Sequence, residues 1–152
     1  MSEEPEAFEL RLNDHRVGVV HWRSTQSYES AVAETATHRW TFDRQGRLRR
    51  RVIIREATAG EPVARFEWGF WRGTLQLSDG RLLRWPQVGA RGFRDKRGFM
   101  VRFEPKPGSD VGYTVSIGDP SLTQEDLALL SLLGVYLIWL SYTDVAADAE
   151  LH

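Results

Sequence analysis

Between residues 7 and 117, hydrophobic and polar positions alternate with a period of two, interrupted at short intervals by turn-forming residues. Phe8 and Leu10 alternate with Glu9 and Arg11 at the start of this region, and the pattern recurs in segments 39–42, 64–70, 74–78, 99–104 and 111–117. A period of two places successive side chains on opposite faces of a β-strand. The pattern therefore predicts strands with one face in a core and the other in water.

The alternation also predicts which side chains point inward. We expect the following to form the core faces of the strands: Trp40, Phe42, Ala64, Phe66, Trp68, Phe70, Leu75, Leu77, Phe99, Val101, Phe103, Val111, Tyr113, Val115 and Ile117. Stretches rich in Gly, Asp or Pro at 43–46, 78–80, 95–98 and 106–108 separate the strands and are typical of tight reversals. Roughly ten to twelve short strands joined in this way predict an antiparallel meander that closes into a barrel.

The pattern changes after Gly118-Asp119-Pro120. Ser121 with Gln124, or Thr123 with Asp126, offers an N-cap and capping box, and Glu125 adds negative charge at the positive end of a helix dipole. We therefore expect a helix over residues 121–143, followed by an acidic tail over 144–152.

This helix has no charged residue between positions 127 and 142, so every side must be buried. Sixteen helical residues are about 24 Å long, shorter than the roughly 30 Å hydrocarbon core of a bilayer. Both flanks are acidic, whereas membrane spans usually carry Lys or Arg on the cytoplasmic side. The length and the flanks favour burial inside the barrel. Two alternatives stay open: a tail-anchored membrane protein with a cytoplasmic β domain, and a lipocalin-like small-molecule carrier with the helix outside.

The order of strands from "AFELRL" to "GYTVSI", followed by "DLALLSLLGVYLIW", resembles the tubby C-terminal-like superfamily, which includes tubby domains, phospholipid scramblases and LURP-one-related proteins. The resemblance covers nearly the whole chain, although the chain is shorter than a typical tubby domain. It implies one domain over residues 1–152, in which a mainly β, closed antiparallel barrel surrounds one buried hydrophobic C-terminal helix. Because tubby domains bind phosphoinositides through a basic surface, it also implies an anionic lipid headgroup as ligand.

Composition narrows the remaining classes. The 152 residues carry 20 basic and 21 acidic side chains, a formal net charge of −1, so the whole molecule has no bulk attraction to nucleic acid or to an anionic membrane. Any such binding must come from a local patch, and we do not expect nucleic acid as the partner. There is no cysteine for a disulfide or a thiolate nucleophile. Residues 1–6 are acidic where a signal peptide would be basic, so we expect a flexible N-terminus and a cytoplasmic location, with peripheral membrane contact if a lipid is bound.

Catalytic chemistry has no visible signature. His15, His21, His38 and His152 lack the spacing of a metal site, and no Walker loop, GxSxG or dinucleotide fingerprint is present. We therefore expect a non-enzymatic protein without metal or cofactor. Glu67 and Glu104 lie within strand patterns, where Arg65 and Arg102 offer ordinary cross-strand partners.

Aromatic residues offer one weaker candidate surface. Trp71, together with Trp22 and Trp85, is compatible either with an exposed aromatic patch or with burial beneath a loop.

The candidate binding site is the basic segment "RQGRLRRRVIIR". Its proposed ligand-binding residues, which surround one hairpin, are Arg47, Arg49, Arg50, Arg51 and Arg55. Guanidinium groups form paired hydrogen bonds with phosphate, which suits an anionic phospholipid headgroup, and the same surface suits a protein partner. The alternative is a solvated outer face that protects a strand from aggregation. Arg49, Arg51 and Arg55 are expected to share that face, interrupted by Ile53.

Overall fold

The computed structural model describes residues 7–12, 15–24, 27–45, 51–69, 72–86, 89–108 and 113–151, with the side chains of all of these except 12, 22–24, 27–29 and 142–151. The expected flexible N-terminus, residues 1–6, lies outside the described residues. The elements are β1 (Ala7–Leu12), β2 (His15–Ser24), β3 (Ser27–Thr35), β4 (Arg39–Gln45), β5 (Arg51–Glu56), β6 (Pro62–Trp68), β7 (Arg72–Leu77), β8 (Leu82–Pro86), β9 (Arg91–Asp95), β10 (Gly98–Pro105), β11 (Tyr113–Ile117) and α1 (Gln124–Leu151).

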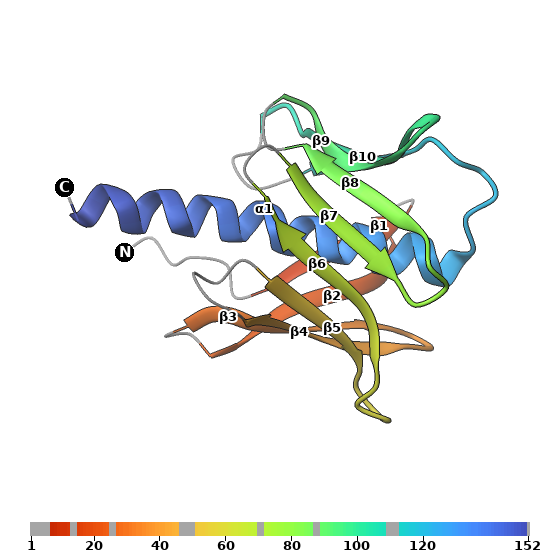
Figure 1. Ribbon diagram of the computed structural model, residues 1–152, viewed down its shortest axis with the longest axis horizontal. Coiled ribbons are helices and arrows are strands. Elements are labelled where there is room, and N and C mark those ends of the chain that lie inside the picture. Colours follow the sequence, from red (N-terminus) through yellow and green to blue (C-terminus); the bar gives the residue numbers. More distant parts are fainter. Residues whose placement is uncertain are drawn as a thin grey trace.

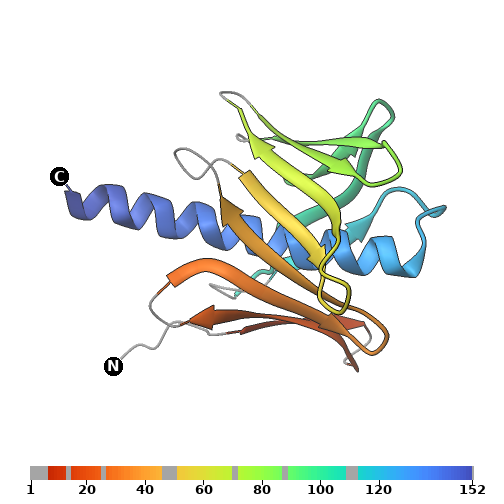
Figure 2. The same ribbon diagram turned by 60° about the horizontal axis from the view of Figure 1, so that its bottom comes forward.

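The eleven described strands form one antiparallel sheet in which each strand pairs with its neighbours in sequence. This confirms the predicted mainly β meander and its number of strands. The sheet curves around α1, with β1–β4 on one side of the helix, β8–β10 on the opposite side and β5–β7 between them (Figures 1 and 2). Among the described residues, no hydrogen bonds join β1 to β11, so the sheet is not closed by its backbone ladder.

The core lies between the concave face of the sheet and the helix. Trp40, Phe42, Phe66 and Leu75 are at most 2% exposed, as the strand pattern predicts. The ring of Phe42 packs against that of Tyr136 on α1, with ring centroids 5.3 Å apart. The helix contributes a further set of buried residues to the same core: Leu129, Leu130, Ser131, Leu132, Leu133, Tyr136, Leu137, Ile138 and Leu140.

The helix begins at a well-defined cap. Thr123 Oγ1 accepts the Asp126 amide at 3.1 Å, and the Thr123 carbonyl accepts the Leu127 amide at 2.9 Å. Of the two predicted N-caps, the structure therefore uses Thr123. The helix continues to Leu151, beyond the predicted end at 143 and into the segment expected to be a tail. No Gly or Pro occurs after Gly134, so nothing in the sequence stops the helix there.

Two inward-facing predictions on the last strands are wrong. The register of β10 against β9 shifts between Phe99 and Val101, so Met100 and Val101 are both buried and Phe99 lies on the outer side, against two arginines. A bulge moves every preceding side chain to the opposite face, which a strict period of two does not anticipate. Ile117 is 55% exposed because β11 is the last strand of the sheet.

The apolar helix satisfies the length and composition of a membrane span over Gln124–Ser141, and 56% of this window is buried within the protein. A core helix and a membrane span pass the same test, so hydropathy alone does not separate them. The contacts of α1 with β1, β2, β3, β9 and β10 show what surrounds it in this structure.

Candidate anion-binding surface

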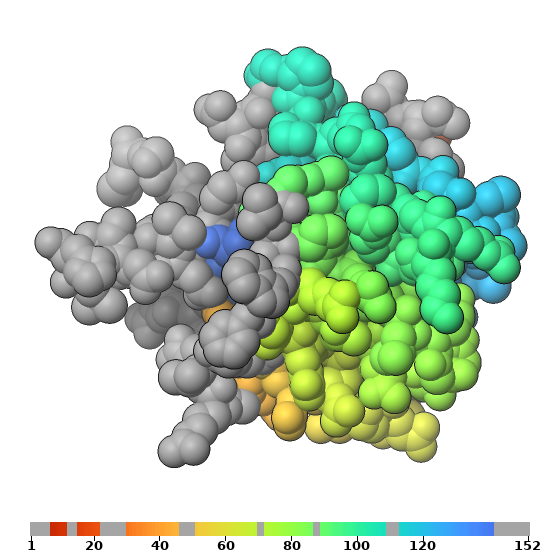
Figure 3. Space-filling model, turned by 45° about the horizontal axis from the view of Figure 1, so that its top comes forward, coloured from red at the N-terminus to blue at the C-terminus, as the bar shows by residue number. Residues whose placement is uncertain are grey.

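The outer faces of β5–β10 are strongly basic. Strand alternation places seven arginines on these faces, which we call the basic face: Arg51, Arg55, Arg65, Arg72, Arg84, Arg94 and Arg102. Three carboxylates lie on the same side of these strands: Glu67 and Glu104 at outward positions, and Asp95 at the end of β9. Much of this surface lies on the side of the molecule shown in Figure 3, from the yellow of β6 to the blue-green of β10.

The outer side of the first four strands has a different balance. Among the described side chains there, Arg11 forms an ion pair with Glu9 at 2.7 Å, and Arg39 lies 3.7 Å from Glu34. Asp43 is a further outward carboxylate and accepts a hydrogen bond from Ser30 at 2.9 Å. The outward arginines of β1–β4 therefore have carboxylates nearby, whereas on β5–β10 the outward arginines outnumber the carboxylates.

The structure describes part of the predicted arginine site. Arg47, Arg49 and Arg50 lie outside the described residues. Arg51 and Arg55 share the outer face of β5 with Ile53 between them, as expected. Arg51 Nε lies 3.0 Å from Glu67 Oε1, so part of its charge is matched within the protein.

A shallow hollow of about 410 Å³ lies beside these residues, over β5–β7, and Arg55 and Arg65 contribute to its lining. Arg55 Nη1 donates to the Gly60 carbonyl at 3.2 Å, and Arg65 Nη2 donates to Gln76 Oε1 at 3.3 Å. Arg65 Nε also lies 3.6 Å from Glu67. The cations at this hollow therefore already have partners, although one carboxylate serves both Arg51 and Arg65.

A second hollow, of about 400 Å³, is built differently. It is lined by Arg72, Arg84, Pro86, Arg94, Asp95 and Lys96, from β7, β8, β9 and the β9–β10 turn. Arg84 and Arg94 are directly opposite each other in the β8–β9 pair. Within the described part of the chain, none of its four cations forms an ion pair. The sequence analysis missed this cluster because Arg72, Arg84 and Arg94 lie on three different strands, ten or more residues apart in sequence.

An aromatic ring adjoins the same basic face. The guanidinium of Arg94 lies 5.2 Å from the centroid of Phe99, and that of Arg102 lies 5.6 Å from it. Arg102 also pairs with Glu104 at 3.4 Å. The ring holds two arginine side chains close to the sheet by cation–π attraction. Their orientation is consequently more restricted than that of an unsupported surface arginine.

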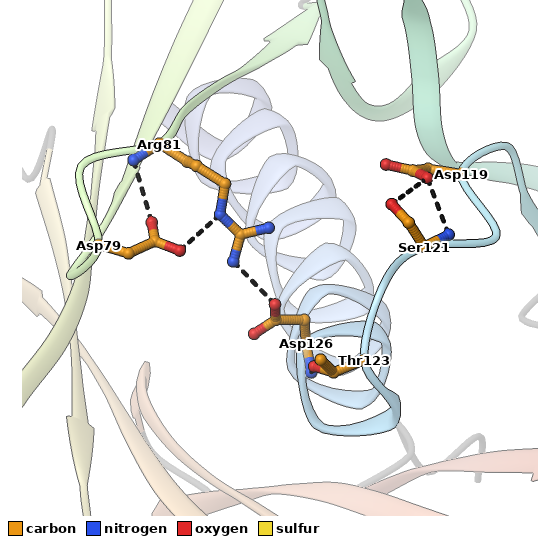
Figure 4. A network of polar contacts seen from close by, with 6 residues as sticks. All are labelled: Asp79, Arg81, Asp119, Ser121, Thr123 and Asp126. Atoms are coloured by element: carbon orange, nitrogen blue, oxygen red, sulfur yellow. Dashed lines mark hydrogen bonds and ion pairs between the residues drawn. The ribbon is translucent and has the colours of Figure 1, made fainter.

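A polar network beside the helix start has a structural role (Figure 4). Arg81 Nη2 donates to Asp126 at 2.8 Å and Arg81 Nε donates to Asp79 at 2.6 Å, which joins the β7–β8 turn to the first turn of α1. Hydrogen bonds from the amide and side chain of Arg81 lower the pKa of Asp79. Those from the hydroxyl and amide of Ser121 lower the pKa of Asp119. Both carboxylates are acceptors within their own turns.

The other sequence candidates have ordinary structural surroundings. Glu67 and Glu104 form surface ion pairs with arginines, but the expected cross-strand partners are wrong: Arg65 and Arg102 lie on the same strands as these glutamates, and the cross-strand pair is Arg51–Glu67. His21 contacts Glu34 at 3.1 Å, His38 contacts Glu125 at 3.2 Å, and His152 lies outside the described residues. In the described ranges, no group of three or more potential metal-ligating side chains gathers.

The aromatic candidates do not form a described exposed patch. Trp85 is 2% exposed, so it cannot belong to an exposed aromatic surface. Trp71 lies outside the described residues, and the side chain of Trp22 is not described.

Comparison of this chain with protein-family models, curated proteins and solved structures gives no significant match. The resemblance to the tubby C-terminal-like superfamily therefore stays a hypothesis based on the order of strands and helix.

Proposed function

We propose that this protein is a non-enzymatic binding domain that recognises anionic phospholipid headgroups through the basic face. The observation that carries this proposal is the imbalance of seven arginines against three carboxylates, Glu67, Asp95 and Glu104, on the outer side of six consecutive strands. Because the formal net charge of the chain is −1, attraction to an anionic surface must come from this local patch.

The physical basis is electrostatic attraction at short range. Each Lys or Arg close to an anionic membrane contributes about 1 kcal/mol to binding, and the attraction falls off within a Debye length of about 8 Å at physiological salt. The arginines of the basic face project from one side of the sheet, so they approach the membrane surface together. Leu82, on the outer side of β8 and 60% exposed, adds an apolar side chain near Arg84.

A protein partner is the less favoured ligand for this face. Specific protein interfaces have a core enriched in aromatic and other apolar side chains and depleted in charge. The outward positions of β6–β9 are dominated by arginine and by uncharged polar residues such as Thr74 and Gln76. Their chemistry matches a layer of phosphate groups better than an apolar protein surface.

We also propose that side chains close the sheet around α1 into a barrel of the tubby-like kind. Support comes from the edges: Phe8 on β1 packs edge-on against Trp139 at 5.6 Å, and Val115 on β11 packs against the same core. The two edge strands of the sheet, β1 and β11, thus both contribute side chains to the core around the helix.

The binding proposal is tested by sedimentation with vesicles of phosphatidylcholine, with and without phosphatidylserine, at low and physiological salt. We expect binding only to the anionic vesicles, weakening as salt is raised. The double variant Arg51→Gln/Arg65→Gln should bind roughly thirtyfold more weakly, because two cations of the basic face, each contributing about 1 kcal/mol, are lost.

The matched control is Arg11→Gln/Arg39→Gln, which removes the same charge from the outer side of β1 and β4. It should bind as the unmodified protein does. Equal weakening by both double variants would refute a localised basic face. Failure of the unmodified protein to bind anionic vesicles would refute the lipid proposal.

A further inference from the structure

We infer that the hollow lined by Arg72, Arg84, Arg94 and Lys96, here called the four-cation hollow, is a binding site for a phosphate monoester group. The inference rests on and deepens the proposed function, because three of these residues belong to the basic face. It makes a separate claim, since a site for one phosphate group differs from a diffuse attraction to a charged membrane.

The first support is the direct opposition of Arg84 and Arg94. Their backbones are paired across β8 and β9, and residues opposite each other in an antiparallel sheet have Cβ atoms about 5 Å apart. Like charges in this arrangement repel each other and destabilise the sheet. Elsewhere on the described surface, exposed arginines such as Arg51 and Arg81 have carboxylate partners. A bound anion would remove the repulsion at this pair.

The second support is the charge of the lining. Four cations face one carboxylate, Asp95, which leaves a formal charge of +3 around about 400 Å³. Asp95 is already engaged, because its Oδ1 atom accepts the Arg97 amide at 2.8 Å in the β9–β10 turn. Its position is explained by the turn, and it does not pair with the arginines of the hollow.

The third support is preorganisation. Arg72, Arg84 and Arg94 project from adjacent strands, whose spacing the sheet fixes, and Pro86 forms part of the wall. Contact with Phe99 restricts Arg94 further. A guanidinium that rests on an aromatic ring keeps its in-plane N–H donors available for hydrogen bonds. Less side-chain freedom is then lost when an anion binds.

These features select a phosphate monoester over a diester. A monoester presents three acceptor oxygens and carries close to two negative charges near neutral pH, whereas a diester carries one. Three guanidinium groups and an ammonium group supply donors for all three oxygens. The group has two sources with this shared chemistry, a soluble phosphate compound or the headgroup of a lipid such as phosphatidic acid.

The test is thermal unfolding of the full chain with increasing inorganic phosphate at constant ionic strength. A ligand that binds the folded state raises the melting temperature. We expect phosphate to stabilise the unmodified protein, and Arg84→Gln/Arg94→Gln to weaken phosphate binding at least tenfold, because each charge-assisted hydrogen bond contributes about a factor of ten. The control Arg51→Gln/Arg65→Gln removes the same charge from the same sheet and should keep the response.

Folding of the variant is checked without phosphate. Both arginines are exposed, and their replacement removes a repulsion, so Arg84→Gln/Arg94→Gln should melt no lower than the unmodified protein. If it melts lower, Lys96→Gln in the β9–β10 turn provides the independent variant. It should weaken phosphate binding, and an unchanged response would overturn the inference.

Vesicles separate the two sources and the two proposals. A loss of binding to phosphatidylcholine vesicles containing phosphatidic acid that is larger in Arg84→Gln/Arg94→Gln than in Arg51→Gln/Arg65→Gln, which removes the same charge, identifies a lipid headgroup. Stabilisation by phosphate through Arg84 and Arg94 without any vesicle binding would identify a soluble ligand and would refute only the membrane proposal. Equal effects of the two double variants on phosphate and vesicle binding would overturn the four-cation hollow and leave the basic face standing.

Discussion

Gly134 lies near the middle of α1, where the ring of Phe103 on β10 packs directly against the helix backbone. A Cβ atom at position 134 would overlap this ring, and even the more distant Cε1 atom would lie only 3.0 Å away. Phe103 is 2% exposed, and its ring centroid lies 5.9 Å from that of Trp85. The ring therefore has little room to move, and Gly134→Ala should destabilise the protein.

The magnitude follows from two opposing effects. Replacing Gly by Ala in a helix interior stabilises the helix by about 1 kcal/mol. Overpacking a tight core costs about 1–3 kcal/mol, and an overlap with a fully buried ring belongs at the upper end of that range. The net loss is about 2 kcal/mol, which corresponds to a fall in melting temperature of about 4–8 °C for a chain of this size.

Circular dichroism during heating and urea unfolding measure the change. Ala128→Gly is the matched control on the same helix: with no overlap involved, it should lose about 1 kcal/mol through propensity alone. In a Phe103→Leu background, Gly134→Ala should cost less stability, because the smaller side chain at position 103 leaves room for the added methyl group. A double-mutant cycle of these two substitutions gives the interaction energy between positions 103 and 134. A rise in melting temperature with Gly134→Ala would refute the packing of α1 inside the sheet.

Three smaller perturbations concern the helix start. Thr123→Ala removes the cap acceptor and should lower the free energy of unfolding by about 1 kcal/mol, while Thr123→Ser retains it; equal urea midpoints for the two would contradict the cap. Arg81→Gln should cost less than about 1 kcal/mol because its ion pairs are solvent-exposed, and high salt should reduce the difference. Because the folded-state pKa values of Asp79 and Asp119 lie below the usual 3.8, the stability they contribute is present above pH about 4 and is lost as pH falls through the folded pKa. In urea unfolding, the free energy of unfolding of Asp119→Asn should fall less on acidification than that of the unmodified protein.

Much of the fold is predictable because local patterns act in the same direction as tertiary packing. Alternation identified Trp40, Phe42 and Phe66 as core residues, and turn residues set the hairpins of the meander. The start of the helix was predictable because capping depends on a few adjacent residues. Its end was not, because acidic residues are compatible with helix and no Gly or Pro marks a stop. The bulge in β10 depends on pairing with β9, which a single strand pattern does not contain.

The site was less predictable for a similar reason. A basic run such as residues 47–55 is visible in the sequence, but the structure shows that Arg51 has a carboxylate partner sixteen residues away in sequence. Arg72, Arg84 and Arg94 each look like an ordinary outward residue of a strand. Their meeting depends on the register of three strands, and the direct opposition of Arg84 and Arg94 is a property of that register alone.

The charge of the chain is therefore organised by the fold and cannot be judged from its total. The central part of α1, residues 127–142, carries no charge, so the charged residues of the strands lie on the outside of the sheet, where strand alternation sorts them. Acidic residues are concentrated in the N-terminal segment and near the C-terminus, while β5–β10 carry the excess of arginine. A chain with net charge −1 can thus present a basic face to an anion and repel it elsewhere, which orients the protein as it binds. The relevant quantity is the charge of one side of the sheet, and the paired arginine variants are designed to change that quantity in two places separately.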